Sequence, residues 1–286
     1  MSYEIKRLGV IPKRLAEIPD PPKELYSVGD LPDFDDPEIK FLAVVGSRKH
    51  SSYGRAACEK IIEGLSGYPI VIVSGLALGI DTIAHETALR NGLATLSVPG
   101  SGLDEKFLYP KSNFALAKEI LKRGGSLLSE LPPKTAAMEW TFPRRNRIMA
   151  GLSDAVLLIE AEEKSGTLIT ARLGMDYNRD VLVVPGEIGS RTSIGTNRLL
   201  KEGAHPCLGS KEILEILGFQ EQENAGKSYA NCTTEELAIL ELLYEPMPKE
   251  LLMQKYPGSV TDLNMFLSLL EIKGHIKETM GEIRKI

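Results

Sequence analysis

The sequence predicts an α/β fold with a mostly parallel sheet, followed by a small domain of the winged-helix type. From Phe41 onward, short apolar runs alternate with amphipathic helical stretches, a pattern typical of parallel strands joined by right-handed helical crossovers. After residue 232 the pattern changes to three short helices and a terminal hairpin-like segment. The chain of 286 residues is long enough to hold both.

The larger pattern contains alternating strands and helices over about 180 residues. The predicted strands are 41–45, 70–74, 94–98, 126–129, 155–160 and 181–185, with a further short strand expected near 204–208. The predicted helices are 53–65, 80–91, 112–123, 143–151, 168–178, 196–202 and 211–217.

Four segments are expected along the chain. Residues 1–40, rich in proline and acids, form an N-terminal arm, and residues 41–219 form the large domain. The polar, aperiodic residues 220–232 form a linker, and residues 233–286 form the winged-helix-like domain. Its third helix would read a DNA groove in a DNA binder, but it carries Asp262 and Glu271 against Lys273, which favours a protein contact over DNA.

Composition limits the classes of protein and of partner. A content of 43% hydrophobic and 26% charged residues is that of a soluble globular protein, and no apolar run approaches the ~20 residues needed to span a bilayer. The N-terminus lacks the apolar core of a secretory signal and the three cysteines have no metal spacing, so a reducing cytoplasm is expected. With a formal charge of -5, a polyanion must meet a local basic patch.

Small and polar residues follow several of the predicted strands. Because the carboxyl ends of parallel strands share one edge of the sheet, these residues should meet there, and glycines and helix N-termini at such an edge suit phosphates. Each loop alone is more often structural, and Asp81 is more often a helix cap than a catalytic carboxylate. The candidate residues are Gly46, Ser47, Arg48, Ser74, Gly75, Ser165, Gly166, Thr167 and Asn197, and Ser51 and Ser52 are expected to point to the same anion.

A basic segment opens the helix predicted at 143–151. Phe142 precedes Arg144, Arg145, Asn146 and Arg147, which combines charge for phosphates with an aromatic face for bases. Arg144 and Arg147 share a helical face while Arg145 points about 100° away, so the three arginines should not have the same role. A solvated basic helix end is the alternative, although arginine is unfavourable at a helix N-terminus without an anionic partner.

Enzyme signatures are mostly missing from the sequence. There is no GxxxxGK[ST] loop, and the turn after the first strand lacks the GxGxxG spacing and the later acid that would hold a ribose. The four histidines have neither metal spacing nor an evident nucleophile partner, so neither a metal nor a cofactor is expected.

Several motifs follow one another along the chain, including VGSR at 45–48, SGLALGID at 74–81, LLSELP at 127–132, FPRRNRIMAGLS at 142–153, SGTLITA at 165–171 and GTNRLLKEGA at 195–204. In these motifs and their order the chain closely resembles the DNA-processing protein A (DprA/Smf) family over about residues 15–218. This resemblance implies an extended Rossmann-like fold without catalytic activity that binds and protects single-stranded DNA and helps load the RecA recombinase, notably in natural transformation. It also implies a homodimer formed through the Rossmann-like domain.

The resemblance also implies roles for particular residues. Arg48, Arg145, Asn146 and Arg147 match the family's basic motifs and Arg144 occupies a variable position, while Ser165, Gly166 and Asn197 match later loops of the same pocket. The chain departs from many members because only some forty residues precede the first strand, too few for a full N-terminal helical domain.

Two other functions compete with this one. Nucleoside-monophosphate phosphoribohydrolases of the lysine-decarboxylase-like group use a related scaffold, but their PGGxGTxxE motif is matched here only by PGSGLDEKF at 99–107. A protein-only adaptor with a vestigial pocket is the third hypothesis.

Overall fold

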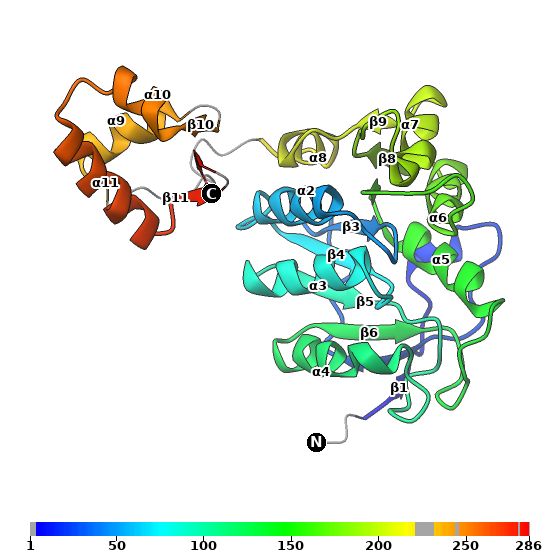
Figure 1. Ribbon diagram of the computed structural model, residues 1–286. Coiled ribbons are helices and arrows are strands. Elements are labelled where there is room, and N and C mark those ends of the chain that lie inside the picture. The colour runs from blue at the N-terminus through cyan, green and yellow to red at the C-terminus, as the bar shows by residue number, and fades with distance from the viewer. Residues whose placement is uncertain (1–3, 221–231, 244–245, 280, 286) are drawn as a thin grey trace. The chain divides into compact units, whose positions relative to one another are not determined.

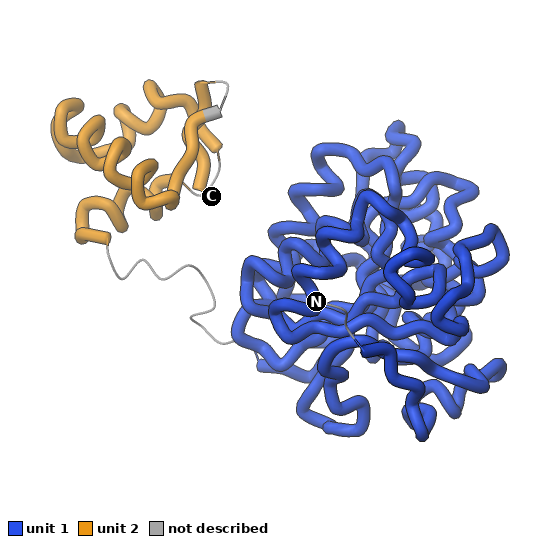
Figure 2. The backbone as a smooth tube through the Cα atoms, turned by 90° about the horizontal axis from the view of Figure 1, so that it is seen from below, with its two compact units in different colours: residues 1–225 blue, residues 226–286 orange. Residues whose placement is uncertain are grey.

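A computed structural model describes residues 4–220, 232–243, 246–279 and 281–285. The chain divides into two compact units, residues 1–225 and 226–286 (Figure 2). The linker expected at 220–232 falls almost entirely on residues 221–231, which lie outside the described residues. No described helix is both long and apolar enough to cross a membrane.

The larger unit is built on a nine-stranded sheet with the order β1-β2-β6-β5-β4-β3-β7-β8-β9 (Figure 1). All neighbours from β6 to β9 are parallel, whereas β2 pairs antiparallel with both β6 and β1. The strands are β1 (Lys6–Arg7), β2 (Tyr26–Gly29), β3 (Lys40–Val45), β4 (Ile70–Ser74), β5 (Ala94–Ser97), β6 (Ser126–Ser129), β7 (Ala155–Leu158), β8 (Asp180–Val183) and β9 (His205–Pro206). The predicted parallel α/β fold is confirmed.

Helices cover both faces of this sheet. One face carries α2 (Ser52–Glu63), α3 (Ile80–Arg90) and α8 (Ser210–Ile216), with α4 (Phe114–Lys122) beside α3. The other face carries α1 (Lys13–Ala16), α5 (Thr141–Leu152), α6 (Thr167–Asp176) and α7 (Ile194–Lys201). The predicted helices and strands differ from these bounds by one or two residues at their ends, which is the usual uncertainty of helix and strand boundaries.

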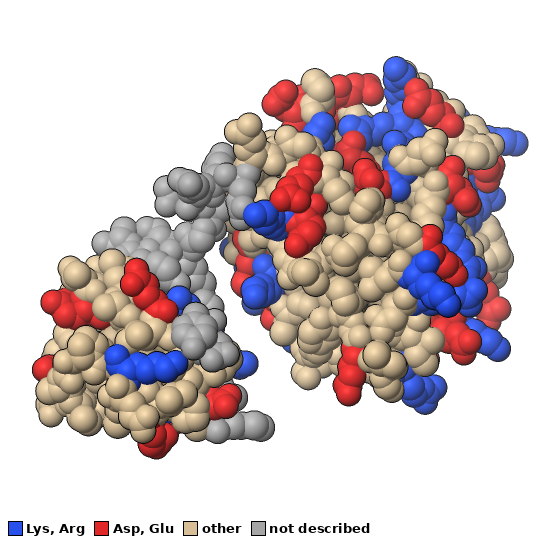
Figure 3. Space-filling view, turned by 90° about the horizontal axis from the view of Figure 1, so that it is seen from above, with Lys and Arg blue, Asp and Glu red and all other residues tan. Residues whose placement is uncertain are grey.

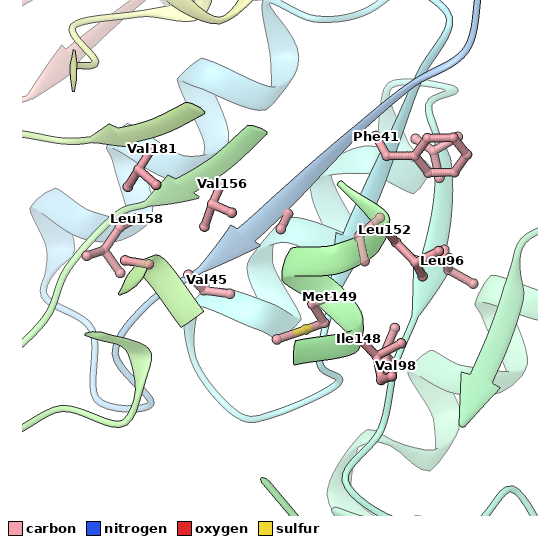
Figure 4. Close-up of a cluster of buried hydrophobic side chains, with 14 of the residues drawn as sticks. Phe41, Val45, Leu96, Val98, Ile148, Met149, Leu152, Val156, Leu158 and Val181 are labelled. Carbon is pink, nitrogen blue, oxygen red and sulfur yellow. The ribbon is translucent and has the colours of Figure 1, made fainter. Parts of the chain in front are cut away.

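The centre of the sheet is apolar on both faces. In β3 every residue after Lys40 is buried, so alternate side chains pack against the helices of opposite faces, as expected for a strand between two helical layers. Figure 4 shows one of these layers, in which Val45 of β3 and Val156 and Leu158 of β7 lie on one side of Met149 of α5. This packing holds α5 against the sheet.

The first forty residues belong to the larger unit. β1 and β2 extend the sheet beyond β6, and α1 packs against α5. Arg14 pairs with Asp154 at 2.7 Å and donates to the Phe34 carbonyl oxygen at 3.1 Å, while the other carboxylate oxygen of Asp154 accepts the amide of Phe41 at 2.8 Å. Asp154 therefore joins this segment to the first parallel strand.

The strand order reverses between β3 and β7. The chain after β3 crosses to the α2 face and the chain after β7 crosses to the α6 face, so their loops diverge at the carboxyl edge. Register Val45↔Leu158 brings the ends of the two strands level. In open parallel sheets such a reversal leaves a crevice, which is where ligands bind.

The smaller unit consists of α9 (Thr234–Leu242), α10 (Lys249–Lys255) and α11 (Val260–Ile272) with a sheet of order β10-β12-β11. These strands are β10 (Met247–Pro248), β11 (Ile276–Thr279) and β12 (Glu282–Lys285). Helices followed by an antiparallel hairpin are the elements expected of a winged helix. The fully buried Glu236 joins α9 to the end of α11, because Lys273 donates to both of its carboxylate oxygens at 2.8 and 2.7 Å.

Glu236 makes the smaller unit sensitive to acid. Burial alone would raise the pKa of Glu236, but the hydrogen bonds from Lys273 and from the Thr233 amide leave it below the ordinary value. Because the folded pKa lies below that of the unfolded chain, this stabilisation is fully present above about pH 4.3 and is lost as the pH falls through the folded pKa.

Replacing Glu236 tests whether its ion pair with Lys273 holds α9 against α11. We expect Glu236→Gln to speed amide exchange in α9 and α11 about tenfold at pH 7, since the ammonium of Lys273 loses its ionised partner. Hydrogen exchange of the full chain, corrected for intrinsic rates, measures this, and Glu241→Gln on the exposed side of α9 is the matched control. Equal exchange in both variants would contradict the assignment.

Candidate functional site

A pocket at the carboxyl edge lies where the strand order reverses. It has a volume of ≈ 460 Å³ and is formed by the loops after β3, β4 and β7 and by the starts of α5 and α6. Its lining includes nine of the fourteen residues that the sequence predicts for the site. They are Gly46, Ser47, Arg48, Phe142, Arg145, Asn146, Ser165, Gly166 and Thr167.

Glycine allows the loop after β3 to lie directly against α3. A Cβ on Gly46 would be 2.6 Å from a side-chain carbon of Ile80, and the Ile80 amide donates to the Ser47 carbonyl oxygen at 3.2 Å. At the start of α3, Gly79 has φ +83 and faces the Ser47 carbonyl oxygen so closely that a Cβ would be 2.3 Å from it. A Cβ on Gly79 would also be 2.7 Å from the Cα of Arg48, so a side chain at this position would displace the backbone of Arg48.

The pocket has a cationic mouth and a buried floor. Arg48, Lys49 and Lys164 are exposed at the mouth, together with Glu162. The floor is formed by four buried residues, Asp81, Arg145, Asn146 and Met149. Figure 3 shows basic and acidic side chains interspersed on one face of the larger unit. This mixture agrees with the formal net charge of -5.

Arg48 and Phe142 form a pair on one wall. The Arg48 guanidinium carbon lies 5.0 Å from the centroid of the Phe142 ring, within the range of a cation–π interaction. The Tyr109 ring is 5.9 Å from that of Phe142 at 58°, and a small second pocket lies between Tyr109, Gly75 and this pair. Gly100 provides the space behind, since a Cβ there would be 2.6 Å from the Phe142 ring.

Arg145 is a floor residue that is held by the protein itself. Its Nη1 donates to the Val98 carbonyl oxygen at 2.7 Å and its Nε donates to Asn146 Oδ1 at 3.1 Å. Asn146 in turn donates to the Gly166 carbonyl oxygen at 3.4 Å, which links α5 to α6. Burial lowers the pKa of Arg145 while Asp81 raises it. The sequence predicts a phosphate contact for Arg145, and the structure also gives it a structural role.

Arg144 and Arg147 lie outside the pocket lining. Both pair with Glu130, Arg144 Nε at 3.2 Å and Arg147 Nη2 at 2.5 Å, and Arg147 Nη1 donates to the Asp20 carbonyl oxygen at 2.6 Å. The side chain of Arg147 is 6% exposed. Arg144 and Arg147 share a helical face, as expected, but the anion on that face is a carboxylate of the same protein. The sequence predicts a phosphate contact for Arg147, but in the structure its guanidinium is buried against Glu130 and the Asp20 carbonyl oxygen.

A carboxylate of the protein itself also occupies the start of α2. Glu160 accepts the Ser51 amide at 2.9 Å, the Ser51 hydroxyl at 2.6 Å and the Thr192 hydroxyl at 2.9 Å. A Cβ on Gly54 would be 2.2 Å from the same carboxylate. The expectation that Ser51 and Ser52 point to a bound anion is therefore wrong for Ser51, because Glu160 occupies that helix N-terminus.

The remaining predicted residues hold loops in place. Ser74 is buried and donates to the Val44 carbonyl oxygen at 2.7 Å, and Gly75 lines only the second pocket. Asn197 forms two hydrogen bonds with the backbone of Gly186, away from the main pocket. Ser165 and Thr167 are hydrogen-bonded to each other at the start of α6.

Two cations and one aromatic ring are among the pocket residues that sequence reasoning missed. Lys49 and Lys164 adjoin the predicted residues Arg48 and Ser165 in the same loops, so a search for every cation within those loops would have found them. Tyr109 lies in the YP pair of residues 109–110, but only the fold brings its ring to Phe142.

The described residues give the enzyme hypotheses no support. The loop of residues 99–102, which resembles the phosphoribohydrolase motif, lies outside the lining of the main pocket, and Ser101 donates within its own loop. His85 is fully buried, hydrogen-bonded to Thr95 at 2.7 Å, and burial lowers its pKa to about 3. Among the described residues no group of three potential metal ligands was found.

A doubly wound sheet whose reversal point carries a pocket lined by cations and an aromatic ring defines a Rossmann-like protein. The family model for DNA recombination-mediator protein A matches residues 8–218. The chain belongs to this family, as its motifs indicate.

Relatives named in this family include Protein Smf of Escherichia coli and DNA processing protein DprA of Streptococcus pneumoniae. The first is 40% identical over 208 residues, which is 73% of this chain and 54% of that protein, and the second is 42% identical over 208 residues, 73% and 71%. The chain thus spans about half the length of the E. coli relative.

Two solved structures share the fold. The DprA structure from S. pneumoniae has a TM-score of 0.68 and 38% identity, covering 74% of each chain. A DprA structure from Helicobacter pylori, described as showing a single-stranded DNA binding mode, has a TM-score of 0.68 and 34% identity, covering 75% of this chain and 96% of that one.

The two basic residues that face Glu130 should differ in their effect on stability. Arg147→Ala should lower the free energy of unfolding by about 3 kcal/mol, because it leaves the buried carboxylate of Glu130 without its buried partner. Arg144→Ala should cost less than about 1 kcal/mol, since Arg144 is 48% exposed. Urea unfolding at pH 7 measures both, and equal losses would contradict the assigned roles.

Proposed function

We propose that this protein binds single-stranded DNA across the pocket at the reversal point of the sheet and acts as a non-enzymatic recombination mediator. The observation that carries the proposal is the exposed cationic mouth beside the Phe142 ring. Phosphates bind to Arg48, Lys49 and Lys164, and a base stacks near Phe142, the combination by which proteins bind single strands. Family membership and the H. pylori relative support the same ligand.

The charges of the pocket favour a strand over a free nucleotide. The helix N-terminus that would hold the phosphate of a mononucleotide, that of α2, holds Glu160 instead. The available cations come from two loops on either side of the opening, after β3 and after β7. Cations on both sides of the opening can contact successive phosphates of a DNA strand that runs across the pocket.

The proposed role leaves the DNA unchanged. The side chains at the pocket floor are hydrogen-bonded to backbone or to each other, and no nucleophile paired with a base was found among the described lining residues. We infer that the strand is held and protected without cleavage.

Partners belong to the same proposal. A mediator delivers its strand to a RecA-type recombinase, and a homodimer formed through the Rossmann-like domain would present two strands or a longer one. The cytoplasmic location expected from the sequence fits both partners.

Removing the mouth cations should weaken DNA binding and its salt dependence together. We expect the triple variant Arg48→Ala, Lys49→Ala, Lys164→Ala to bind oligo-dT at least tenfold more weakly. The slope of log K against log salt should flatten by about 2, or about 0.7 for each lost phosphate contact. Fluorescence anisotropy at several salt concentrations gives both values.

The control for this experiment is a cation far from the pocket. Lys122→Ala, at the exposed end of α4, should leave the affinity and the slope unchanged. Duplex of the same length should bind more weakly than oligo-dT to the wild-type protein. The proposal fails if the triple variant and the wild type have the same slope.

The mediator role predicts that the protein accelerates RecA filament formation on strands covered by single-strand binding protein. The triple variant should lose this acceleration while still folding, because it no longer holds the strand. ATP hydrolysis by RecA on such strands measures the rate. If RecA hydrolyses ATP at the same rate with and without the wild-type protein, the proposed mediator role is wrong, while the proposed DNA binding is unaffected.

A further inference from the structure

The loop of residues 75–79 after β4 (the wall loop) contains a strained residue. Leu76 has φ +62, in the left-handed region that residues with a side chain rarely adopt, and its side chain is fully buried. Such a conformation costs free energy and persists only where the surrounding structure holds it. Contacts around Leu76 must therefore fix the wall loop.

Asn113 makes contacts of this kind. It lies in a short 3-10 helix, Lys111–Asn113, directly before α4, and is 6% exposed. Its Nδ2 donates to the Leu76 carbonyl oxygen at 2.8 Å, to the Ala77 carbonyl oxygen at 3.2 Å and to Thr82 Oγ1 at 2.8 Å. The Thr82 hydroxyl in turn donates to the Ala77 carbonyl oxygen at 2.8 Å. One carboxamide thus fixes two successive carbonyl groups of the wall loop.

The wall loop lies against two arginines of the main pocket. The backbone at Gly75 is in direct contact with the guanidinium of Arg145, since a Cβ there would be 1.5 Å from Nη1. At the other end of the loop, a Cβ on Gly79 would be 2.7 Å from the Cα of Arg48. The conformation of the wall loop therefore limits the positions open to both arginines.

Asn113 also connects the wall loop to the segment that carries Tyr109. The amide of Asn113 donates to the Pro110 carbonyl oxygen at 3.1 Å. Tyr109 and Pro110 line one side of the small second pocket, and Ala77 and Leu78 of the wall loop also line it. Asn113 belongs to the lining of neither pocket, so it acts on both only through the segments that it joins.

Building on the proposed DNA binding, we propose that Asn113 is a positioning residue, which holds the wall loop in its strained conformation and so fixes the pocket around Arg48 and Arg145. Asn113 itself does not touch the strand. Without its carboxamide, nothing offsets the cost of the left-handed conformation at Leu76, and the loop relaxes. The two arginines then lose a rigid support, and ordering them costs free energy when DNA binds.

DNA affinity and its salt dependence test this role together. Asn113→Ala should bind oligo-dT about tenfold more weakly than the wild type, because the Leu76 carbonyl oxygen loses its donor and the wall loop relaxes. The slope of log K against log salt should keep its wild-type value, since every cation of the mouth remains. Fluorescence anisotropy measures both, at a temperature where urea unfolding shows each variant to be folded. A merely structural role would lower the stability but not the affinity.

Milder changes at Thr82 decide the question if Asn113→Ala does not fold. Thr82→Val removes only the hydroxyl that links Asn113 to Ala77, and it should weaken binding about threefold. Thr82→Ser keeps this hydroxyl and should bind as tightly as the wild type.

Asn91→Ala is the matched control. Asn91 Nδ2 also donates to a backbone carbonyl oxygen, that of Thr87 at 2.8 Å, but at the opposite end of α3 from the wall loop. The variant loses the same kind of hydrogen bond and should keep the wild-type affinity for oligo-dT.

Hydrogen exchange gives a second readout that needs no DNA. The amides of Gly75 and Ala77 donate to Asp81 Oδ2 at 3.1 and 3.3 Å. They should exchange about tenfold faster in Asn113→Ala than in the wild type, because the wall loop opens more often. In Asn91→Ala they should exchange at the wild-type rate.

The outcomes separate this inference from the proposed function. If folded Asn113→Ala and Thr82→Val bind oligo-dT as tightly as the wild type, the positioning role is wrong and DNA binding stands. The positioning role is also wrong if Asn91→Ala weakens binding as much as Asn113→Ala, or if exchange of Gly75 and Ala77 is unchanged in Asn113→Ala. Absence of any single-strand binding by the wild type overturns the proposed function itself, and the positioning role with it.

Discussion

The parallel hydrogen bonding of β3 to β4 on one side and to β7 on the other is the constraint on which the site depends. It brings the carboxyl ends of these strands level at one edge, and the reversal of strand order there sends the next helices to opposite faces. The loops that follow must separate, and the space between them is the pocket. For that reason residues more than a hundred positions apart, such as Arg48 and Ser165, line the same pocket.

Much of the charge around this pocket is neutralised by the protein itself. Glu160 holds the start of α2, and Glu130 holds two arginines of α5. The buried pair of Glu130 and Arg147 is a poor source of stability in itself, but breaking it is costly, so it fixes the position of α5. The cations left for a ligand are those of exposed loops, where Arg48 and Lys164 have solvent around them.

The sequence predicts the fold well and the site in part. Periodicity and glycine placement are local signals, and they located β3, the loop at Gly46 and the helix from Thr141 to within two residues. The direction of a side chain within a helix is also local, which is why Arg145 could be separated from Arg144 and Arg147. The acidic partners of Arg147 could not be predicted from the local sequence, because Asp20 and Glu130 belong to other segments of the chain.

The sequence by itself therefore determined the parallel α/β architecture, the family and the edge at which the pocket lies, because short-range periodicity and ordered motifs encode them. Only the tertiary structure decided which residues remain available there. Glu160 and Ser51 are 109 positions apart, and their hydrogen bond removes one anion site. The place of Asp81 on the pocket floor beside Arg145 and Asn146 likewise depends on segments that are distant in the sequence, and no local pattern predicts it.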